Sequence, residues 1–199
     1  MRVLFGLSSA LVTSLILAAP AFAQKPGTAP PQTPMAGAPQ TPGANRLSRA
    51  DMEFVKKAAE GGLAEVEFGK VAEQNAQDPQ VKQFGSRMVK DHTAANDQLK
   101  SILSGMGVPA PDQLNQRDAQ MRDRLARLTG AQFDRDYMRM MVNDHNKDIK
   151  EFRHEAETGQ DPQIKAFAQQ TLKVIEDHDR LAHEVDRALT ATGSSQPRR

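Results

Sequence analysis

The pattern of hydrophobic and polar positions divides the chain into a short apolar start, a polar segment and a long region with helical periodicity. From residue 48 onward, apolar side chains recur every three or four residues, which is the spacing of one face of an α-helix. Proline and glycine interrupt this pattern and divide it into predicted helices over about residues 48–76, 79–104, 112–128, 131–158 and 162–191. No segment shows the alternation expected of a β-strand.

A short repeat marks the turns of two predicted hairpins. Gln-Asp-Pro-Gln occurs at residues 77–80 and again at residues 160–163. In each copy the aspartate is an N-cap residue and the proline lies in the first helical turn, and Ser48 with Asp51 forms a capping-box pattern before the first helix. The predicted helix 112–128 can carry the chain back along the bundle between the hairpins. The expected fold is therefore all-α, a ferritin-like four-helix bundle of two helical hairpins with a short crossover helix.

The two ends of the chain differ in composition from the helical region. Residues 1–23 combine a positive start, a short apolar core and the sequence Ala-Phe-Ala, which are the three parts of a secretory signal peptide. Residues 24–47 are rich in proline and contain Pro-Gln-Thr-Pro twice, which is typical of a disordered linker. Residues 193–199 are expected to form a disordered tail. These assignments leave residues 48–192 as one helical bundle domain.

Cleavage of the signal peptide is expected after Ala23, which would place the mature protein in the periplasm or outside the cell. The chain contains no cysteine, which excludes disulfides, thiolate metal sites and thiol catalysis. The full chain has 26 basic and 25 acidic residues, and the loss of Arg2 with the signal peptide makes the two numbers equal. This balance does not indicate nucleic-acid binding. No segment after the signal peptide is apolar enough for a transmembrane anchor, and no protein partner can be named.

Asp-His pairs occur once on each of three predicted helices. The histidines of these pairs, His92, His145 and His178, lie at the centre of the apolar face of their helices when positions are counted at 100° per residue. His154 and His183 fall away from these faces. Each of the three histidines lies near the middle of its predicted helix, counted from the turn of its hairpin. The three imidazoles are therefore expected to converge at the centre of the bundle.

Glu65 is a carboxylate on the apolar face of the first predicted helix. Glu65 and His92 are almost equally far along the chain from Asp78, so that the hairpin brings them to one level. Three imidazoles and one carboxylate suit a single zinc, copper or iron ion. The alternative is a metal-free polar network in which the buried groups satisfy each other or hold water. The residue types alone leave both interpretations open.

The aspartates that precede the three histidines, Asp91, Asp144 and Asp177, lie 100° to one side. They are candidates to orient a histidine ring on a neighbouring helix, although an exposed surface charge is the favoured interpretation for at least one of them. The di-iron motif of ferritin-like proteins is absent, because Glu-x-x-His occurs only at residues 151–154 and faces outward. With no nucleophile–base pair or phosphate-binding loop either, an enzyme is the less favoured interpretation.

Four stretches of the sequence carry a family resemblance. They are residues 64–69, 88–96, 132–138 and 141–145. This set resembles the bacterial exported family known as "domain of unknown function 4142", and the likeness covers about residues 51–185. The resemblance implies a ferritin-like fold and an outer-membrane or periplasmic location, and it implies no activity. Asp134 and Tyr137 belong to the pattern, and Asp134 is interpreted as a helix-start or structural residue.

Two functions of different classes fit these observations. The first is an exported helical bundle with a mononuclear metal site formed by one glutamate and three histidines. The second is a non-catalytic envelope or stress-related protein whose metal-free polar core only specifies packing. The distances between the imidazole nitrogens distinguish the two, because separations above about 6 Å would exclude a single ion with metal–nitrogen bonds near 2 Å.

Overall fold

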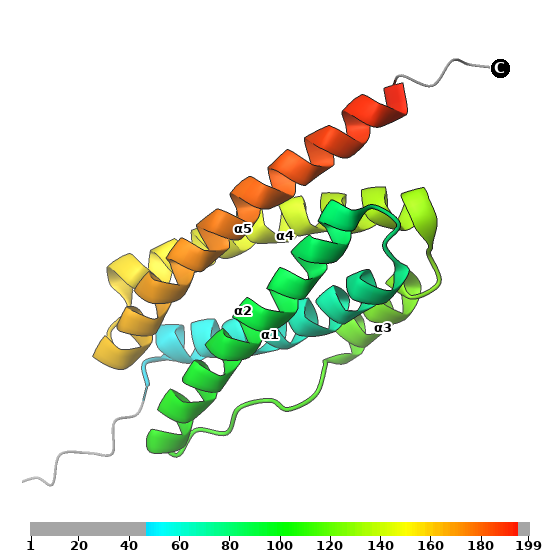
Figure 1. Ribbon diagram of the computed structural model, residues 1–199. Helices are drawn as coiled ribbons and strands as arrows, with labels where there is room; N and C mark the ends of the chain where they lie inside the picture. Colours follow the sequence, from blue (N-terminus) through cyan, green and yellow to red (C-terminus); the bar gives the residue numbers. More distant parts are fainter. Residues whose placement is uncertain (1–46, 195–199) are drawn as a thin grey trace, which may run out of the picture. The chain divides into compact units, whose positions relative to one another are not determined.

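The computed structural model describes residues 47–194, with side chains described to residue 191. This part of the chain forms five helices and no strand: α1 (Arg49–Asn75), α2 (Pro79–Gly105), α3 (Gln116–Leu125), α4 (Gly130–Thr158) and α5 (Pro162–Ser194) (Figure 1). The all-α prediction is confirmed. The predicted signal peptide, and the predicted linker except Leu47, lie outside the described residues. Helix α5 continues to Ser194 and so extends two residues into the predicted tail.

The four long helices form a bundle in which α1 packs against α2 and α4, and α5 packs against the same two helices. Helix α2 ends near the N-terminal end of α1, where Val108 and Pro109 line a pocket together with Met52. Helix α4 begins at the opposite end of α1, where Asn75 donates a hydrogen bond to the carbonyl of Leu128. Helices α2 and α4 therefore occupy opposite corners and run in the same direction. Two hairpins joined by such a crossover form the predicted ferritin-like bundle.

The crossover contains less helix than the sequence predicts. Helix α3 covers only part of the expected range 112–128, because the chain before it has no regular structure and residues 126–127 form a turn. Its N-cap is Asn115, whose side chain accepts a hydrogen bond of 3.0 Å from the backbone N–H of Asp118. The apolar residues of the crossover nevertheless pack against the bundle as their spacing predicts; they are Leu114, Met121, Leu125 and Leu128.

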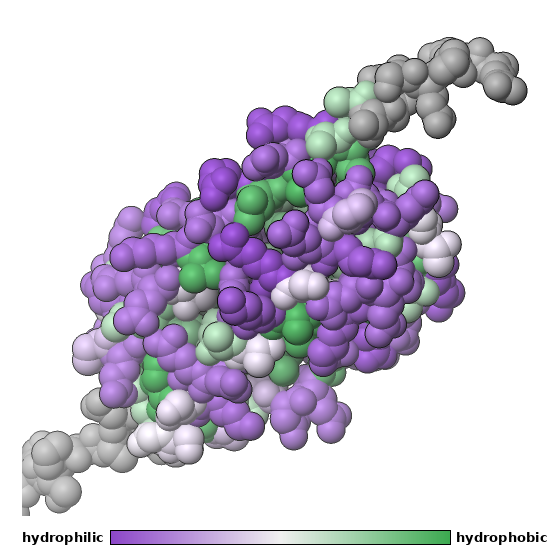
Figure 2. Space-filling model, viewed as in Figure 1, coloured by the Kyte–Doolittle hydropathy of each residue, from purple (hydrophilic) through white to green (hydrophobic). Residues whose placement is uncertain are grey.

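The hydrophobic core consists of two clusters, one toward each end of the bundle. One contains Phe68, Phe84 and Tyr137, and the other contains Phe54 and Phe167. On α2, α4 and α5 the central histidine lies in sequence between residues of the two clusters, so that a polar layer separates them. The outer surface is mainly hydrophilic, with small separate hydrophobic patches on the face seen in Figure 2. Among the described helices, none combines the length and apolarity needed to cross a membrane.

Each hairpin turn is held by an aspartate from the other hairpin. Asp134 of α4 accepts hydrogen bonds of 3.0 and 2.9 Å from the backbone N–H groups of residues 77–78. Asp51 of α1 accepts hydrogen bonds of 3.0 and 3.1 Å from those of residues 160–161. The structural role predicted for Asp134 is confirmed. Asp51 does not complete a capping box, since its carboxylate binds the distant turn while Ser48 caps the helix.

Replacing Asp134 with alanine is expected to lower the free energy of unfolding by about 2–4 kcal/mol, because two backbone N–H groups lose a charge-assisted acceptor. Asp134 is 2% exposed, so water cannot easily replace the lost carboxylate. Urea unfolding followed by circular dichroism measures the change. Asp136→Ala is the matched control, because the Asp136 side chain is 43% exposed. An equal loss in the two variants would contradict the assignment.

Helices α1 and α2 lie close together at two glycines, Gly69 and Gly85. A Cβ atom on Gly69 would lie 2.7 Å from the carbonyl oxygen of Gly85, and a Cβ atom on Gly85 would lie 2.7 Å from the Cβ of Ala72. Contacts this short exclude larger residues unless the helices separate. This contact fixes the position of α2 along α1, and it lies about two helical turns before His92.

Candidate metal centre

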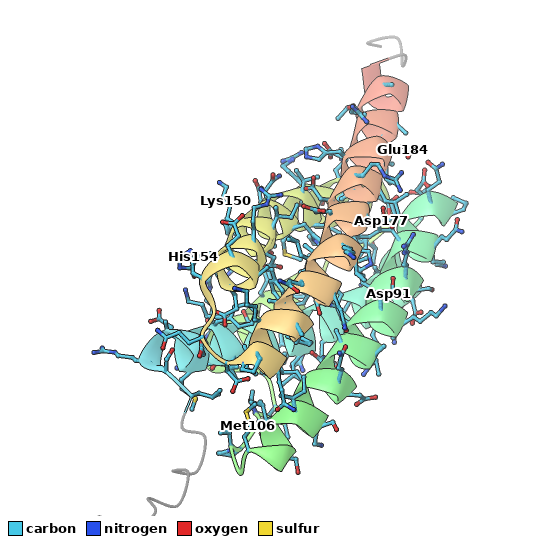
Figure 3. The ribbon with its side chains drawn as sticks, turned by 90° about the vertical axis from the view of Figure 1, so that its left-hand side faces the viewer. Asp91, Met106, Lys150, His154, Asp177 and Glu184 are labelled. Atoms are coloured by element: carbon cyan, nitrogen blue, oxygen red, sulfur yellow. The ribbon has the colours of Figure 1, made fainter. Side chains whose placement is uncertain are left out.

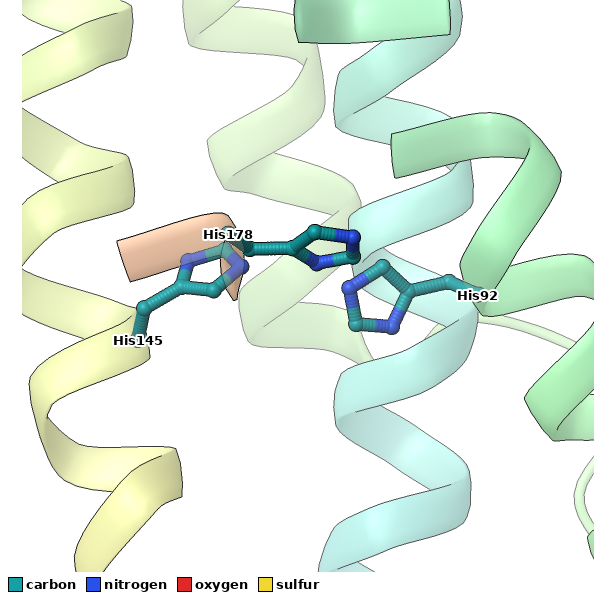
Figure 4. Close-up of side chains that lie close together, drawn as sticks. All are labelled: His92, His145 and His178. Atoms are coloured by element: carbon teal, nitrogen blue, oxygen red, sulfur yellow. The ribbon is translucent and has the colours of Figure 1, made fainter. Parts of the chain in front are cut away.

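Three histidines from three helices meet at mid-height in the bundle (Figure 4). His92 of α2 is 7% exposed, and His145 of α4 and His178 of α5 are fully buried. One ring nitrogen of each residue lies within 4.8 Å of the corresponding nitrogens of the other two. The predicted convergence of the three imidazoles is confirmed, and their separation lies below the limit of about 6 Å that would exclude a single ion.

Local sequence aims each of these histidines inward. Each lies on a helix stripe whose neighbours, one turn or more before and after it, are buried apolar residues. His145, for example, lies four residues after Met141 and seven before Phe152, and both of these side chains belong to the core. A histidine at such a position must follow the apolar stripe into the interior when the helix packs.

Two of the rings are oriented through the nitrogen that points away from the cluster. His145 Nδ1 lies 2.9 Å from the carbonyl oxygen of Met141, and His178 Nε2 lies 2.9 Å from a carboxylate oxygen of Asp91. Both partners accept hydrogen bonds, so these nitrogens carry the proton in the neutral rings. The lone pairs of His145 Nε2 and His178 Nδ1 are therefore left free. Both of these atoms, and His92 Nε2, are buried and have no hydrogen-bond partner.

The environment keeps the three rings neutral. Burial, reinforced by His178, lowers the pKa of His145 to about 4. Burial and the other two histidines hold the pKa of His92 well below its usual value. Burial also lowers the pKa of His178, although the hydrogen bond to Asp91 acts in the opposite direction. Neutral imidazole is the form that binds metal ions, so the rings are ready to bind at neutral pH without losing a proton.

The three aspartates beside the histidines have different environments. Asp91 binds His178 and also accepts a hydrogen bond of 3.1 Å from Arg87. Burial alone would raise the pKa of Asp91, but these two partners lower it. Asp144 pairs with Lys147, and Asp177 pairs with Arg180. Of the three candidates, only Asp91 lies against a histidine of the cluster, and the other two form ion pairs at the surface.

Glu65 is buried but is not part of the converging group. Within the described residues, the group of side chains whose ligand atoms converge contains the three histidines alone. Glu65 is 5% exposed and its Oε2 has no hydrogen-bond partner. Burial, together with the nearby carboxylates of Asp148 and Asp144, raises its pKa well above the usual value. Its assignment as the fourth ligand stays a prediction.

Asp148 is a candidate that the sequence analysis did not name, although its spacing from His145 could have indicated it. Asp148 lies three residues after His145, which is one helical turn away on a similar face. Burial, together with Asp144 and Glu151, raises its pKa to about 7. Its side chain lines a small cavity of about 30 Å³ that is also lined by His92. A further carboxylate, besides Asp91, therefore lies near the histidine layer.

Comparison with known proteins gives a family and a fold. The model of a family described as "Domain of unknown function (DUF4142)" matches residues 36–185. Two solved structures are similar: a DUF305 fragment from Deinococcus radiodurans (TM-score 0.62, 15% identity, 71% of this chain and 98% of that chain) and a putative secreted DUF305 protein from Streptomyces coelicolor (TM-score 0.60, 15% identity, 71% and 92%). At this identity the similarity concerns the fold alone. None of the curated proteins compared with the chain matches it.

Proposed function

Since the chain belongs to the DUF4142 family, whose description names no activity, we propose a function from the histidine cluster. The cluster binds one transition-metal ion. The supporting observation is the set of three buried ring nitrogens without partners, on His92, His145 and His178. A buried acceptor without a partner costs about 1–3 kcal/mol. One cation placed between the three nitrogens would satisfy all of them together.

The cluster needs a small adjustment to hold an ion. Metal–nitrogen bonds of about 2.0–2.1 Å in a tetrahedral site bring the nitrogens to about 3.4 Å from one another, compared with separations of up to 4.8 Å. Rotation of the His92 ring supplies part of this change, because no hydrogen bond orients its Nε2. The chemistry of three imidazoles suits zinc, copper or iron. The fourth position is open to Glu65 or to water.

We further propose that the protein holds this ion outside the cytoplasm, after cleavage following Ala23. The support is the signal-peptide pattern of residues 1–23 and the absence of cysteine. A site with three neutral histidine ligands needs no reduced thiol and is compatible with an oxidising compartment. No enzyme mechanism is proposed, because no described residue pairs a nucleophile with a base at the cluster.

Titration of the mature protein with zinc, copper and iron salts tests the proposal. Calorimetry and elemental analysis of the dialysed samples are expected to show up to one ion per chain. Binding should also raise the melting temperature, because the ion binds the folded chain in preference to the unfolded one. A protein that takes up none of the three metals would instead have the alternative function, a structural bundle with a metal-free polar core.

Asp91→Asn is expected to weaken metal binding about 10–100-fold, because His178 loses the carboxylate that orients its ring and increases its basicity. Asp144→Asn is the matched control, since Asp144 also precedes a histidine of the cluster but pairs with Lys147 at the surface. Competition with a zinc-binding dye measures both affinities. Equal affinity of the two variants would show that Asp91 does not support the site.

A further inference from the structure

A groove with a volume of about 340 Å³ separates α2 from α5 on one face of the bundle. Asp91 and Asp177 come from these two helices on this face (Figure 3). Two contacts between the helices frame the groove. Arg87 lies 3.8 Å from Asp177 at one end, and Gln98 donates a hydrogen bond of 2.9 Å to Gln170 at the other. The hydrogen bond of 2.9 Å between Asp91 and His178 also joins the two helices at the groove.

The floor of the groove leads toward the histidine cluster. His92 lines the groove and also lines the small cavity beside Asp148. Ala95, Thr171 and Ile175 line both spaces as well, so that one layer of side chains separates them. His145 and His178 are fully buried, and neither lines the groove or the small cavity. His92 is thus the member of the cluster nearest to solvent.

The charged side chains that line the groove are two carboxylates, Asp91 and Asp177, and two cations, Arg87 and Lys173. Asp91 and Asp177 lie on its two sides, and Arg87 contacts both, at 3.1 Å and 3.8 Å. Arg87 thereby covers two carboxylates that would otherwise face an approaching ion. Its side chain is 41% exposed and can move away at little cost, because ion pairs near the surface contribute little stability.

We propose that a transition-metal ion enters and leaves the three-histidine site through the groove between α2 and α5, that His92 is the first ligand it meets, and that Arg87 covers the entrance. This inference rests on the proposed function. It assigns the groove a role in the rate of exchange rather than in the strength of binding. A change in the groove should therefore alter association and dissociation together.

Stopped-flow mixing of the full mature chain with zinc, and then with a chelator, tests the route. Ala95→Leu fills the floor of the groove and is expected to slow association and dissociation at least about fivefold each, with the equilibrium affinity nearly unchanged. Ala166→Leu is the matched control, because Ala166 is exposed on α5 and does not line the groove. Ala94→Leu, at an exposed groove position, serves as a second variant should Ala95→Leu fail to fold.

The entrance has its own test. Arg87→Gln exposes Asp91 and Asp177 and is expected to speed association about threefold at low salt, with the difference disappearing at high salt. Arg180→Gln is the control, since Arg180 pairs with Asp177 but does not line the groove. Wild-type rates in Ala95→Leu and Ala94→Leu, or equal slowing in Ala166→Leu, would overturn the route. Failure of the wild type to bind zinc, copper or iron would overturn the proposed function itself.

Discussion

Replacing His145 with alanine is expected to abolish metal binding by the bundle. His145 is fully buried, its ring is oriented by the carbonyl of Met141, and its Nε2 has no other partner. Without this ligand, an ion would keep two imidazoles, and the affinity should fall well over about a hundredfold, which is the upper range for loss of a supporting residue alone. Elemental analysis after dialysis should find up to one ion per chain in the wild type and none in His145→Ala.

His154→Ala is the control for this prediction. His154 lies on the same helix but is exposed, and its Nε2 lies 3.4 Å from the hydroxyl oxygen of Thr158. The variant should bind metal as the wild type does. Circular dichroism and melting curves establish that His145→Ala still folds, and His178→Ala provides an independent second variant. Equal loss of metal in His145→Ala and His154→Ala would show that the ligands have been assigned wrongly.

Metal affinity is expected to change little between pH 7 and pH 5. Three histidines with the usual pKa of about 6.5 would be mostly protonated at pH 5, and proton competition would weaken binding about ten-thousandfold. Burial lowers the pKa of His145 to about 4, and it lowers the pKa of His92 and His178 as well. The rings therefore stay neutral to lower pH, and the expected loss of affinity by pH 5 is much smaller than it would be for three histidines with the usual pKa.

The same lowered pKa values also make the stability of the metal-free protein depend on pH, so stability has to be measured beside metal affinity. In the unfolded chain these histidines bind protons near pH 6.5, whereas the folded chain resists protonation until about pH 4 at His145. Their contribution to stability is therefore fully present above pH 6.5 and is lost as the pH falls toward 4. Zinc competition titrations at several pH values, each with an unfolding curve, separate loss of binding from loss of fold. A steep loss of affinity near pH 6 in a folded protein would contradict the prediction.

The helices and their pairing could be predicted because their signals are local. Asp-Pro at residues 78–79 and 161–162 combines a cap with a residue that cannot lie in a helix interior, and the structure begins α2 and α5 there. The connection between the hairpins was less predictable. The apolar stripe of residues 112–128 has helical spacing, but helix α3 covers only Gln116–Leu125, while the leucines of the stripe still pack. Periodicity reports which side chains are buried more reliably than it reports helix length.

The histidine cluster was predictable for a similar reason. Position on a helix face follows from counting residues, and the two similar hairpins place His92, His145 and His178 at one height. Roles that depend on side-chain direction across helices could not be derived in this way. Asp91 and Asp144 occupy the same place in the Asp-His motif, yet Asp91 binds His178 while Asp144 binds Lys147. The difference arises from the rotation of each helix against its neighbour, which no local pattern records.

The exchange of aspartates between the hairpins has a consequence for folding. Asp51 of the first hairpin completes the turn of the second, and Asp134 of the second completes the turn of the first. Neither hairpin satisfies its own buried N–H groups when it is alone, so a half-formed bundle leaves both turns incomplete. The two halves should therefore lose their structure in a single cooperative transition. An ion held between α2, α4 and α5 would then have two ways out: through the groove between α2 and α5, or by opening of the whole bundle.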